Sequence, residues 1–257
     1  SPSERARARF PLAAAVSRLA PGTYRIAGGI DDGDLANESL GWLLTGYAFS
    51  RYRPGVAETP GPALVAPDTV DAHRIEHLAA AEALTRDLIN TPASDMGPDA
   101  LEAEARTLAD AFDARIEVTT GAALLDANFP MIHAVGRAAH QAPRLIDMRW
   151  GSTGPIVTLV GKGVCFDTGG LNLKPGGSMG LMKKDMGGAA NVLGLARAIM
   201  ALGLRVQLRV LIPAVENSVS SQSFRPQDIL TSRKGLTVEI NNTDAEGRLV
   251  LAHALAL

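Results

Sequence analysis

The sequence predicts an α/β fold with a mostly parallel central sheet flanked by helices. Apolar runs of strand-like composition alternate with segments of helical spacing from about residue 69 onward. This alternation is typical of parallel sheets that carry helices on both faces. The 257 residues are 46% hydrophobic and 20% charged, which allows a sizeable core. In such folds ligands collect at the carboxyl ends of the strands.

Three segments between residues 69 and 203 have the features of helices. Residues 69–90 have amphipathic spacing, and the Asn-Thr-Pro sequence at 90–92 breaks the pattern. Pro98 stands where a second helix begins, because proline is favoured in the first turn. Residues 187–203 form the third segment. Each of these helices is long enough to cover part of a sheet.

Five apolar or alternating runs predict the strands, and they lie at residues 114–120, 144–150, 155–161, 205–213 and 237–241. The run that ends at Gly161 is consistent with a buried strand whose end delivers Lys162 into a loop. Polar, glycine-rich stretches follow several of these runs. These stretches are where a ligand site is expected.

The Pro-rich stretch ETPGPALVAPD at 58–68 predicts a boundary between domains, because proline and glycine restrict helix and strand formation. We expect a partial N-terminal domain and linker at 1–65 and a larger domain at 66–257. The final residues, RLVLAHALAL, have the apolar spacing of a helix with no stop signal after it. The larger domain is therefore expected to be incomplete at its C-terminus.

Charge and cysteine content exclude several classes of protein. The formal net charge of −2 gives no broad attraction for nucleic acid, so nucleic-acid partners are not predicted. A single cysteine, Cys165, cannot form an internal disulfide framework and is expected to be a small buried residue. Neither a signal-like segment nor an apolar run of transmembrane length is visible, so we expect a cytoplasmic protein without membrane association.

Acids and bases gather in the polar stretches that follow the strands. NNTDAEGR, at 241–248, places its charged side chains two residues apart, which puts them on one face of an extended segment. Two neighbouring divalent ions need bridging carboxylates, and the acids of these stretches can supply such a cage. The candidate residues are Lys162, Asp167, Lys174, Asp185, Asp244, Glu246 and Arg248.

Simpler interpretations of the same residues stay open at this point. Asp244 and Glu246 also suit a solvated turn that caps a helix, and Lys162 also suits an ordinary ion pair at a loop surface. A lysine ligates a metal only if its pKa is depressed, which leaves the amine neutral. His73 and His77 lie four residues apart on a predicted helix but lack a third ligand nearby, so we interpret them as surface residues.

Other chemistries fit the sequence poorly. The GKG at 161–163 lacks the spacing and the following Ser or Thr of a phosphate-binding P-loop. The absence of HExxH and of histidine beside the acids disfavours histidine-dominated zinc sites. No GxSxG is present for a serine nucleophile.

The sequence VGKGVCFDTGGLNLKPGGSMGLMKKDMGGAANVLG, followed by NNTDAEGRLVLA, closely resembles the leucyl aminopeptidase (cytosol aminopeptidase) family, whose signature is NTDAEGRL. The resemblance spans roughly residues 69–257. It implies that 66–257 is a catalytic domain, and that the N-terminal residues are the remnant of a smaller α/β domain. It also implies that relatives continue for well over a hundred residues and assemble as homohexamers, each a dimer of trimers.

Carried onto this sequence, the resemblance implies a site for two divalent metal ions, Zn²⁺ or Mn²⁺ and possibly Mg²⁺ or Co²⁺. Asp167 and Glu246 would bridge the ions, Lys162 and Asp185 would complete the tighter site, and Asp244 would bind the second ion. Two catalytic residues would act beside them. Lys174 would lie near the substrate carbonyl, and Arg248 would hold a bicarbonate ion.

The implied function is hydrolysis of N-terminal residues, Leu-like ones preferred, from peptides with a free N-terminus by a two-metal-activated water. Two alternatives from other classes remain. A two-metal phosphoesterase also uses a carboxylate cage. A non-catalytic assembly or nucleic-acid-binding subunit would use metals only for structure, and salt-sensitive DNA binding would support it.

Overall fold

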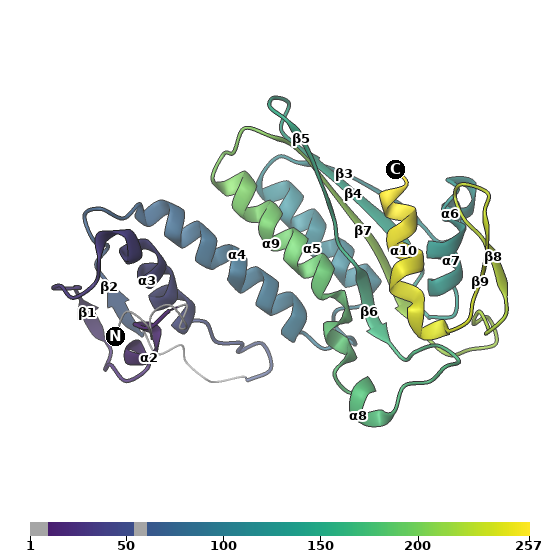
Figure 1. Ribbon diagram of the computed structural model, residues 1–257, viewed down its shortest axis with the longest axis horizontal. Coiled ribbons are helices and arrows are strands. Elements are labelled where there is room, and N and C mark those ends of the chain that lie inside the picture. Colours follow the sequence, from purple (N-terminus) through teal and green to yellow (C-terminus); the bar gives the residue numbers. More distant parts are fainter. Residues whose placement is uncertain (1–9, 54–60) are drawn as a thin grey trace. The chain divides into compact units, whose positions relative to one another are not determined.

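The structure is a computed structural model that describes residues 10–53 and 61–257 (Figure 1). The Arg-rich start and the first part of the Pro-rich stretch, residues 58–60, lie outside the described residues. The chain divides into two compact units, Ser1–Ala83 and Leu84–Leu257. This division falls inside a helix, α4 (Ala72–Asn90), rather than near residue 65. A boundary at 65/66 stays a prediction from the sequence alone.

The first unit contains short elements, which are α2 (Ala13–Val16), β1 (Gly22–Tyr24), α3 (Asp32–Thr45), β2 (Pro62–Leu64) and the start of α4. Strands β1 and β2 pair in parallel. Trp42 of α3 is buried, and its indole Nε1 donates to the Pro62 carbonyl oxygen at 2.7 Å. This bond ties the helix to the small sheet.

The second unit holds the main sheet and its helices. Its strands are β3 (Arg115–Thr120), β4 (Arg144–Trp150), β5 (Ile156–Val160), β6 (Gly163–Asp167), β7 (Gln207–Asn217), β8 (Ile229–Thr231) and β9 (Thr237–Glu239). Its α-helices after α4 are α5 (Pro98–Ala111), α6 (Ala123–Asp126), α7 (Pro130–Gly136), α8 (Gly176–Met179), α9 (Gly187–Ala201) and α10 (Glu246–Leu255). Two short 3-10 helices, η1 (Met182–Met186) and η2 (Thr243–Ala245), complete the set.

The main sheet has the order β3-β4-β7-β5, and β6 also pairs with β7. Strands β5 and β6 run parallel to β7, whereas β4 runs antiparallel to both β3 and β7. All its strands but β4 therefore point the same way, as the sequence predicts. The strand predicted at 237–241 corresponds to β9, which pairs with β8 in a separate antiparallel sheet. Its inclusion in the main sheet was wrong.

Strands β5 and β6 both pair with β7, one after the other and in the same register. Val160 pairs with Leu211 and Gly163 pairs with Ala214, so the pairing resumes in step after Lys162. The sequence predicts a loop after Gly161, and the structure places Lys162 in a short loop, the two-residue break between β5 and β6. A register shift between Val164 and Asp167 then turns the end of β6.

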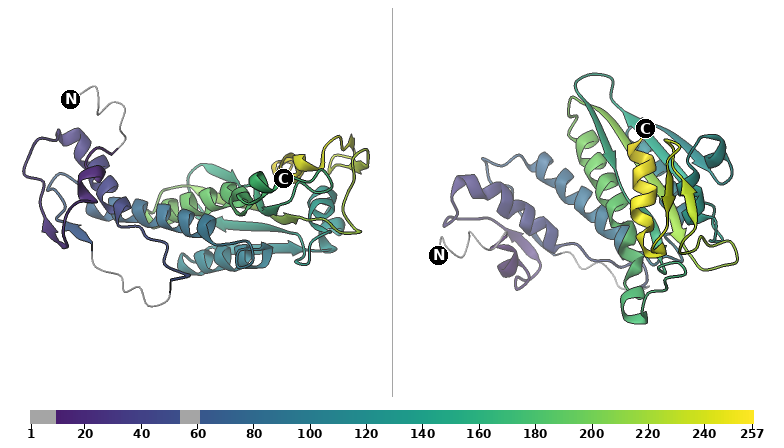
Figure 2. Two further views of the ribbon diagram at one scale, coloured as in Figure 1. Left: turned by 90° about the horizontal axis from the view of Figure 1, so that it is seen from below. Right: turned by 45° about the vertical axis from the view of Figure 1, so that its right-hand side comes forward.

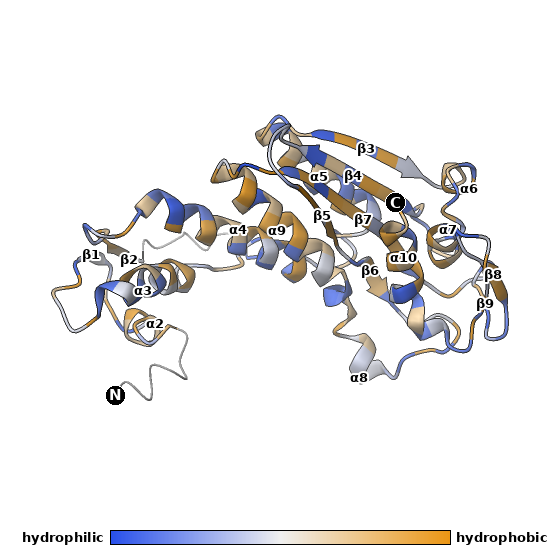
Figure 3. Cartoon of the chain, turned by 45° about the horizontal axis from the view of Figure 1, so that its top comes forward, coloured by the Kyte–Doolittle hydropathy of each residue, from blue (hydrophilic) through white to orange (hydrophobic). Residues whose placement is uncertain are grey.

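Each face of the main sheet has its own hydrophobic core. On β7, Leu208, Val210 and Ile212 face the core shared with α5 and α9, whereas Leu211 and Val215 face the core shared with α7 and α10. This follows from the two-residue period of a strand. Figure 2 shows the helices of this unit around its strands, and Figure 3 shows apolar and hydrophilic segments along β4 and β7.

Two further expectations concern single features of the chain. Cys165 is a free, buried residue with 1% exposure, as the sequence predicts, and burial raises the pKa of its thiol. Among the described residues, no helix combines the length and the apolarity needed to cross a membrane.

Candidate metal centre

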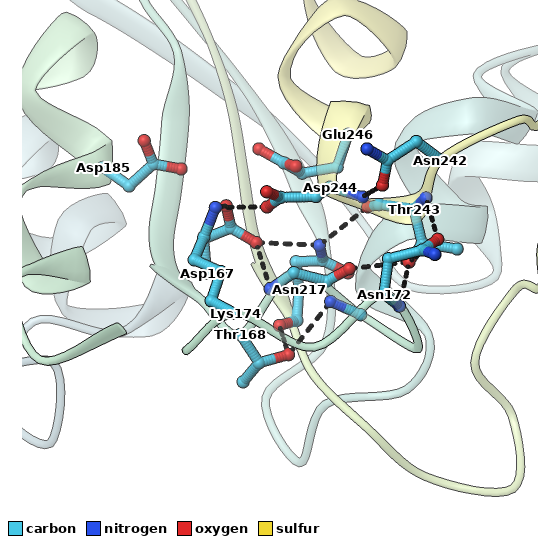
Figure 4. Close-up of polar contacts among 12 residues, drawn as sticks. Asp167, Thr168, Asn172, Lys174, Asp185, Asn217, Asn242, Thr243, Asp244 and Glu246 are labelled. Atoms are coloured by element: carbon cyan, nitrogen blue, oxygen red, sulfur yellow. Dashed lines mark hydrogen bonds and ion pairs between the residues drawn. The ribbon is translucent and has the colours of Figure 1, made fainter. Parts of the chain in front are cut away.

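The predicted acidic residues and two of the predicted bases converge at one end of the main sheet. Asp167 ends β6, Asp185 lies in η1 just before α9, and Glu246 is the first residue of α10. Figure 4 shows these side chains together with Asp244 and Lys174. The site therefore lies where helices from both faces of the sheet begin, close to the carboxyl ends of β6 and β7.

Lys162 pairs with two carboxylates, and we call these residues the Lys162 group (Lys162, Asp185 and Glu246). Its Nζ lies 2.8 Å from Asp185 Oδ2 and 2.8 Å from Glu246 Oε1. The Glu246 side chain is only 2% exposed. A half-buried lysine between two carboxylates differs from the surface ion pair that an isolated GKG would suggest.

Glycines at the starts of two helices make room for Lys162. A Cβ at Gly247, in α10, would lie 2.7 Å from Lys162 Cε, and one at Gly188, in α9, would lie 2.8 Å from the Lys162 backbone nitrogen. The Ala189 N–H also donates to the Lys162 carbonyl oxygen at 2.9 Å. Both helices therefore fix the position of this lysine by close backbone approach.

Lys174 lies between two other carboxylates, and we call these residues the Lys174 group (Lys174, Asp167 and Asp244). Its Nζ is 2.9 Å from Asp167 Oδ2 and also contacts Asp244 Oδ1. Lys174 lies on the loop after β6, where its backbone N–H donates to the Thr168 carbonyl oxygen. The loop thus places a second cation beside the acids.

Asp167 receives hydrogen bonds from the protein around it. The Gly169 N–H donates to Asp167 Oδ1 at 2.9 Å, and Asn217 Nδ2 donates to the same oxygen at 2.8 Å. Asn217 also donates to the Thr243 carbonyl oxygen at 3.1 Å. Asn217 ends β7, so the neighbouring strand orients the aspartate.

The Asp244 loop is anchored to the Lys174 loop by reciprocal bonds. The Thr243 N–H donates to Asn172 Oδ1 at 2.8 Å, and the Asn172 N–H donates to Thr243 Oγ1 at 2.8 Å. The Asp244 N–H donates to Asn242 Oδ1 at 2.9 Å. The bonds between Thr243 and Asn172 join two segments that are about seventy residues apart in the sequence.

The cluster has the donor set and the geometry to hold cations. One carboxylate oxygen from each of Asp167, Asp185 and Glu246 lies within 4.8 Å of the others. Glu246 Oε2 is buried and lacks a hydrogen-bond partner among the described residues. Buried polar atoms normally have partners, so an oxygen of this kind suits a ligand atom. Divalent ions favour such oxygen donors.

The pKa shifts reflect the two groups. Burial lowers the pKa of Lys162, but its bonds to Asp185 and Glu246 outweigh this effect and raise it. For Glu246, burial and the nearby charge of Asp167 raise the pKa against the opposing effect of Lys162. For Asp167, burial acts to raise the pKa, but Lys174, Gly169 and Asn217 together lower it. Asp167 is thus stabilised as an anion more fully than Glu246 is.

Arg248 is not a member of either ion-paired group. It is exposed on α10 and makes no ion pair within residues 10–53 and 61–257. It lines a cavity of about 430 Å³ with Asp244, Asn241 and Glu239. The structure therefore places Arg248 beside one acid of the cluster, with its guanidinium available to an anion.

The sequence missed the residues that orient the ligands, chiefly Asn217, Thr243 and Asn172. Asn217 could have been found from the same signal that identified Asp167, which is a polar side chain at the position where an apolar strand ends.

Two methionines near the site differ in burial. Met186 belongs to the hydrophobic core, whereas Met182 is half-buried.

Residues 83–257 match the model of the cytosol aminopeptidase family, catalytic domain. The chain is 40% identical over 230 residues to a probable cytosol aminopeptidase of Syntrophotalea carbinolica, covering 84% of this chain and 46% of that protein. It is 38% identical over 252 residues to one of Corynebacterium efficiens, covering 94% of this chain and 50% of that protein. The chain spans about half the length of these curated relatives.

Solved structures give the same result. The cytosol aminopeptidase of Coxiella burnetii is 45% identical, with a TM-score of 0.88, over 95% of this chain and 53% of that chain. The leucyl aminopeptidase of Trypanosoma brucei, solved with bestatin, is 30% identical, with a TM-score of 0.83, over 95% of this chain and 49% of that chain. With a family match over most of its length and the acid–lysine cluster in place, this chain belongs to the cytosol aminopeptidase family.

Proposed function

We propose that this protein is a metal-dependent aminopeptidase that removes N-terminal residues, Leu-like ones preferred, from peptides with a free N-terminus. The observation that carries the proposal is the convergence of Lys162, Asp167, Asp185, Asp244 and Glu246, far apart in sequence, within one cluster. Membership of the family supports it.

Two divalent ions would be held by this cluster. Asp167 and Glu246 would bridge them, Lys162 and Asp185 would complete one site, and Asp244 would complete the other. Bound divalent ions supply Lewis acidity and hydroxide at neutral pH. Ions that bind Asp185 and Glu246 would withdraw the negative charge that raises the pKa of Lys162, which favours its neutral amine.

Lys174 would act on the substrate as a cation. Burial lowers its pKa, but its bonds to Asp244 and Asp167 outweigh this effect and raise it, so the ammonium form is favoured at neutral pH. An ion that engages those carboxylates would free Lys174 to donate a hydrogen bond to the scissile carbonyl oxygen. A donor of this kind contributes about 2.7–4 kcal/mol to the stability of the transition state.

Arg248 would hold a bicarbonate ion in the cavity beside Asp244. Its planar guanidinium can donate two parallel hydrogen bonds to the anion. When bound, a bicarbonate ion would supply a general base beside the metal cluster, and Arg248 would hold and orient it. The exposed position of Arg248 in the cavity supports this role.

Three finer properties belong to the same proposal. We infer Zn²⁺ or Mn²⁺ as the ions, with Mg²⁺ or Co²⁺ as alternatives, since an oxygen-rich site with one amine accepts several. A bottromycin maturation enzyme that is 33% identical was solved with Mn. We also propose a homohexamer, a dimer of trimers, in the cytoplasm, as the resemblance implies.

The test combines metal analysis with hydrolysis of leucine p-nitroanilide in the presence of Mn²⁺, Zn²⁺ or Mg²⁺. We expect Asp244→Ala and Glu246→Ala to abolish hydrolysis and to lower metal content. Asp110→Asn, an exposed acid on α5, is the matched control and should keep both. Full activity in either site variant would refute the assignment. Phosphatase turnover without peptidase turnover would favour a phosphoesterase.

A further inference from the structure

A pair of histidines on α4 lies outside the carboxylate cluster. His73 and His77 are four residues apart, so they share one face of the helix. Their Nε2 atoms are 2.9 Å apart. His73 is exposed and His77 is half-buried, so solvent reaches the pair. The spacing places the two rings on one face, and the short distance between their Nε2 atoms shows that both nitrogens can reach one ion.

The separation of the two nitrogens matches two ligands of a single ion. Histidine nitrogens bind transition metals at about 2.0–2.1 Å, and two of them at right angles around an ion are about 2.9 Å apart. A tetrahedral angle would place them roughly 3.4 Å apart. The observed 2.9 Å agrees with the right-angled arrangement.

The two Nε2 atoms form a hydrogen bond, and the ring centres show that this bond is not collinear. In a linear N–H···N bond of this length, the two ring centres would be about 5.2 Å apart. On one ion with right-angled ligands they would be about 4.5 Å apart. The centres of His73 and His77 are 4.1 Å apart, with the ring planes at 88°. The observed distance is shorter than both values, so the contact between the two Nε2 atoms is a bent hydrogen bond between perpendicular rings, and a bound ion would take its place.

We propose that His73 and His77 bind a divalent transition-metal ion through their Nε2 atoms, at a site separate from the carboxylate cluster. Right-angled nitrogen ligands are typical of Cu²⁺ and Ni²⁺. No third His, Cys, Asp or Glu joins the pair in a cluster within the described residues. Water therefore completes the coordination. The two imidazole nitrogens favour Cu²⁺ and Ni²⁺, whereas the oxygen-rich carboxylate cluster accepts harder divalent ions.

Binding at this pair also stabilises α4. The ion links residues one helical turn apart, and this link exists only while the backbone between them is helical. A ligand that binds only the folded state raises the melting temperature in proportion to the logarithm of its concentration. The site therefore has a spectroscopic readout and a thermal one, and neither depends on peptidase activity.

The test is a Cu²⁺ titration of the protein after its carboxylate cluster has been saturated with Mg²⁺, followed by electron spin-echo envelope modulation, which counts coordinated imidazoles. We expect one Cu²⁺ with two imidazoles per chain, and a rise in melting temperature with Ni²⁺. His73→Ala and His77→Ala should each lose the two-imidazole signal and the thermal shift. An unchanged signal in either variant would overturn the proposal.

Two controls keep the result specific. The double variant Arg74→His with His77→Ala keeps two histidines on α4 but places them one residue apart, on different faces. This double variant should lose the two-imidazole Cu²⁺ signal as the single variants do. If it binds Cu²⁺ as the wild type does, chelation across one helical turn is contradicted. His140→Ala removes an exposed histidine elsewhere and should leave the two-imidazole signal intact. Its loss in that variant would equally count against the assignment.

Discussion

The Lys162 group and the Lys174 group contain the same chemical groups, one lysine and two carboxylates, but the protein completes them differently. In the Lys174 group, Asp167 receives bonds from Gly169 and Asn217 as well as from the lysine. In the Lys162 group, Glu246 keeps a buried oxygen without a hydrogen-bond partner among the described residues. One group is therefore stabilised by the protein itself, and the other gains most from an added cation.

The largest expected difference separates the two lysines. Lys162→Met removes a proposed ligand and should weaken divalent-ion binding by about 100-fold or more. Lys174→Met should keep the metal content but lower kcat by about 10²–10³-fold, because it removes one donor to the developing oxyanion. Metal content by mass spectrometry and the kinetics of leucine p-nitroanilide hydrolysis measure the two effects. Equal metal loss in both variants would remove the distinction between the groups.

The second prediction compares the two buried acids in metal-free protein. The pKa of Asp167 lies below its ordinary value, so its ionised form stabilises the fold above that ordinary pKa, and the gain is lost as the pH falls through the folded pKa. Asp167→Asn should cost about 3 kcal/mol at neutral pH. Burial raises the pKa of Glu246, so its ionised form is not favoured by folding, and Glu246→Gln should change stability by less than about 1 kcal/mol. Urea unfolding of both variants tests this, and a large loss in Glu246→Gln would contradict it.

The third prediction concerns His253, at the opposite end of α10 from Glu246. It is 1% exposed, its Nε2 accepts from the Arg233 N–H, and its Nδ1 has no hydrogen-bond partner among the described residues. Burial and the charge of Arg233 lower its pKa from 6.5 to about 4.

Because the folded pKa of His253 is below the unfolded one, its contribution is present above pH 6.5 and is lost as the pH falls toward 4. About 2 kcal/mol of stability should disappear between pH 6.5 and about pH 5. His253→Gln should flatten this part of the stability profile, which unfolding by urea at several pH values measures. An unchanged slope would show that other groups cause the acid sensitivity.

The smallest expected effect comes from Lys183, which shares η1 with Asp185 but is not a member of the Lys162 group. Its Nζ donates to the carbonyl oxygen of Asn90, the last residue of α4, at 2.6 Å. A cation at a helix C-terminus is favourable by about 1 kcal/mol. Because Lys183 shares η1 with Asp185, Lys183→Met should weaken metal binding by about fivefold. Lys183→Arg should restore it, and the exposed neighbour Lys184→Met should have no effect in the same titration.

Much of the fold follows from local sequence patterns. The predicted helices correspond to α4, α5 and α9, because their apolar spacing and the position of Pro98 are local signals. The strands β3, β4, β5 and β7 also lie within or close to the predicted runs. Local patterns therefore identify the longer elements.

What the sequence could not supply depends on contacts between distant residues. The five residues of β6 begin with a glycine and are followed by Thr168 and two glycines, and only their pairing with β7 makes them a strand. The direction of β4 and the separate pairing of β8 with β9 are likewise tertiary properties. A strand of three residues carries too short a pattern to reveal its sheet.

The site divides in the same way. The acids and lysines were named from their residue types, from their position after strands and from the family resemblance. Their pairing was not, because the sequence does not show that Lys174 lies between Asp167 and Asp244. The bonds of Asn217 and Thr243 also join segments far apart in the chain. Spacing thus identified the charged residues but not the network that orients them.

The shared register of β5, β6 and β7 has a consequence for hydrogen exchange. The Gly161 N–H donates to the Leu211 carbonyl oxygen, and the Thr168 N–H donates to that of Asn217. These amides flank Lys162 and Asp167 and depend on the same partner strand. In deuterated buffer they should lose protection in one concerted opening rather than separately. Separate exchange rates would mean that the two ends of the segment that carries Lys162 and Asp167 open independently of each other.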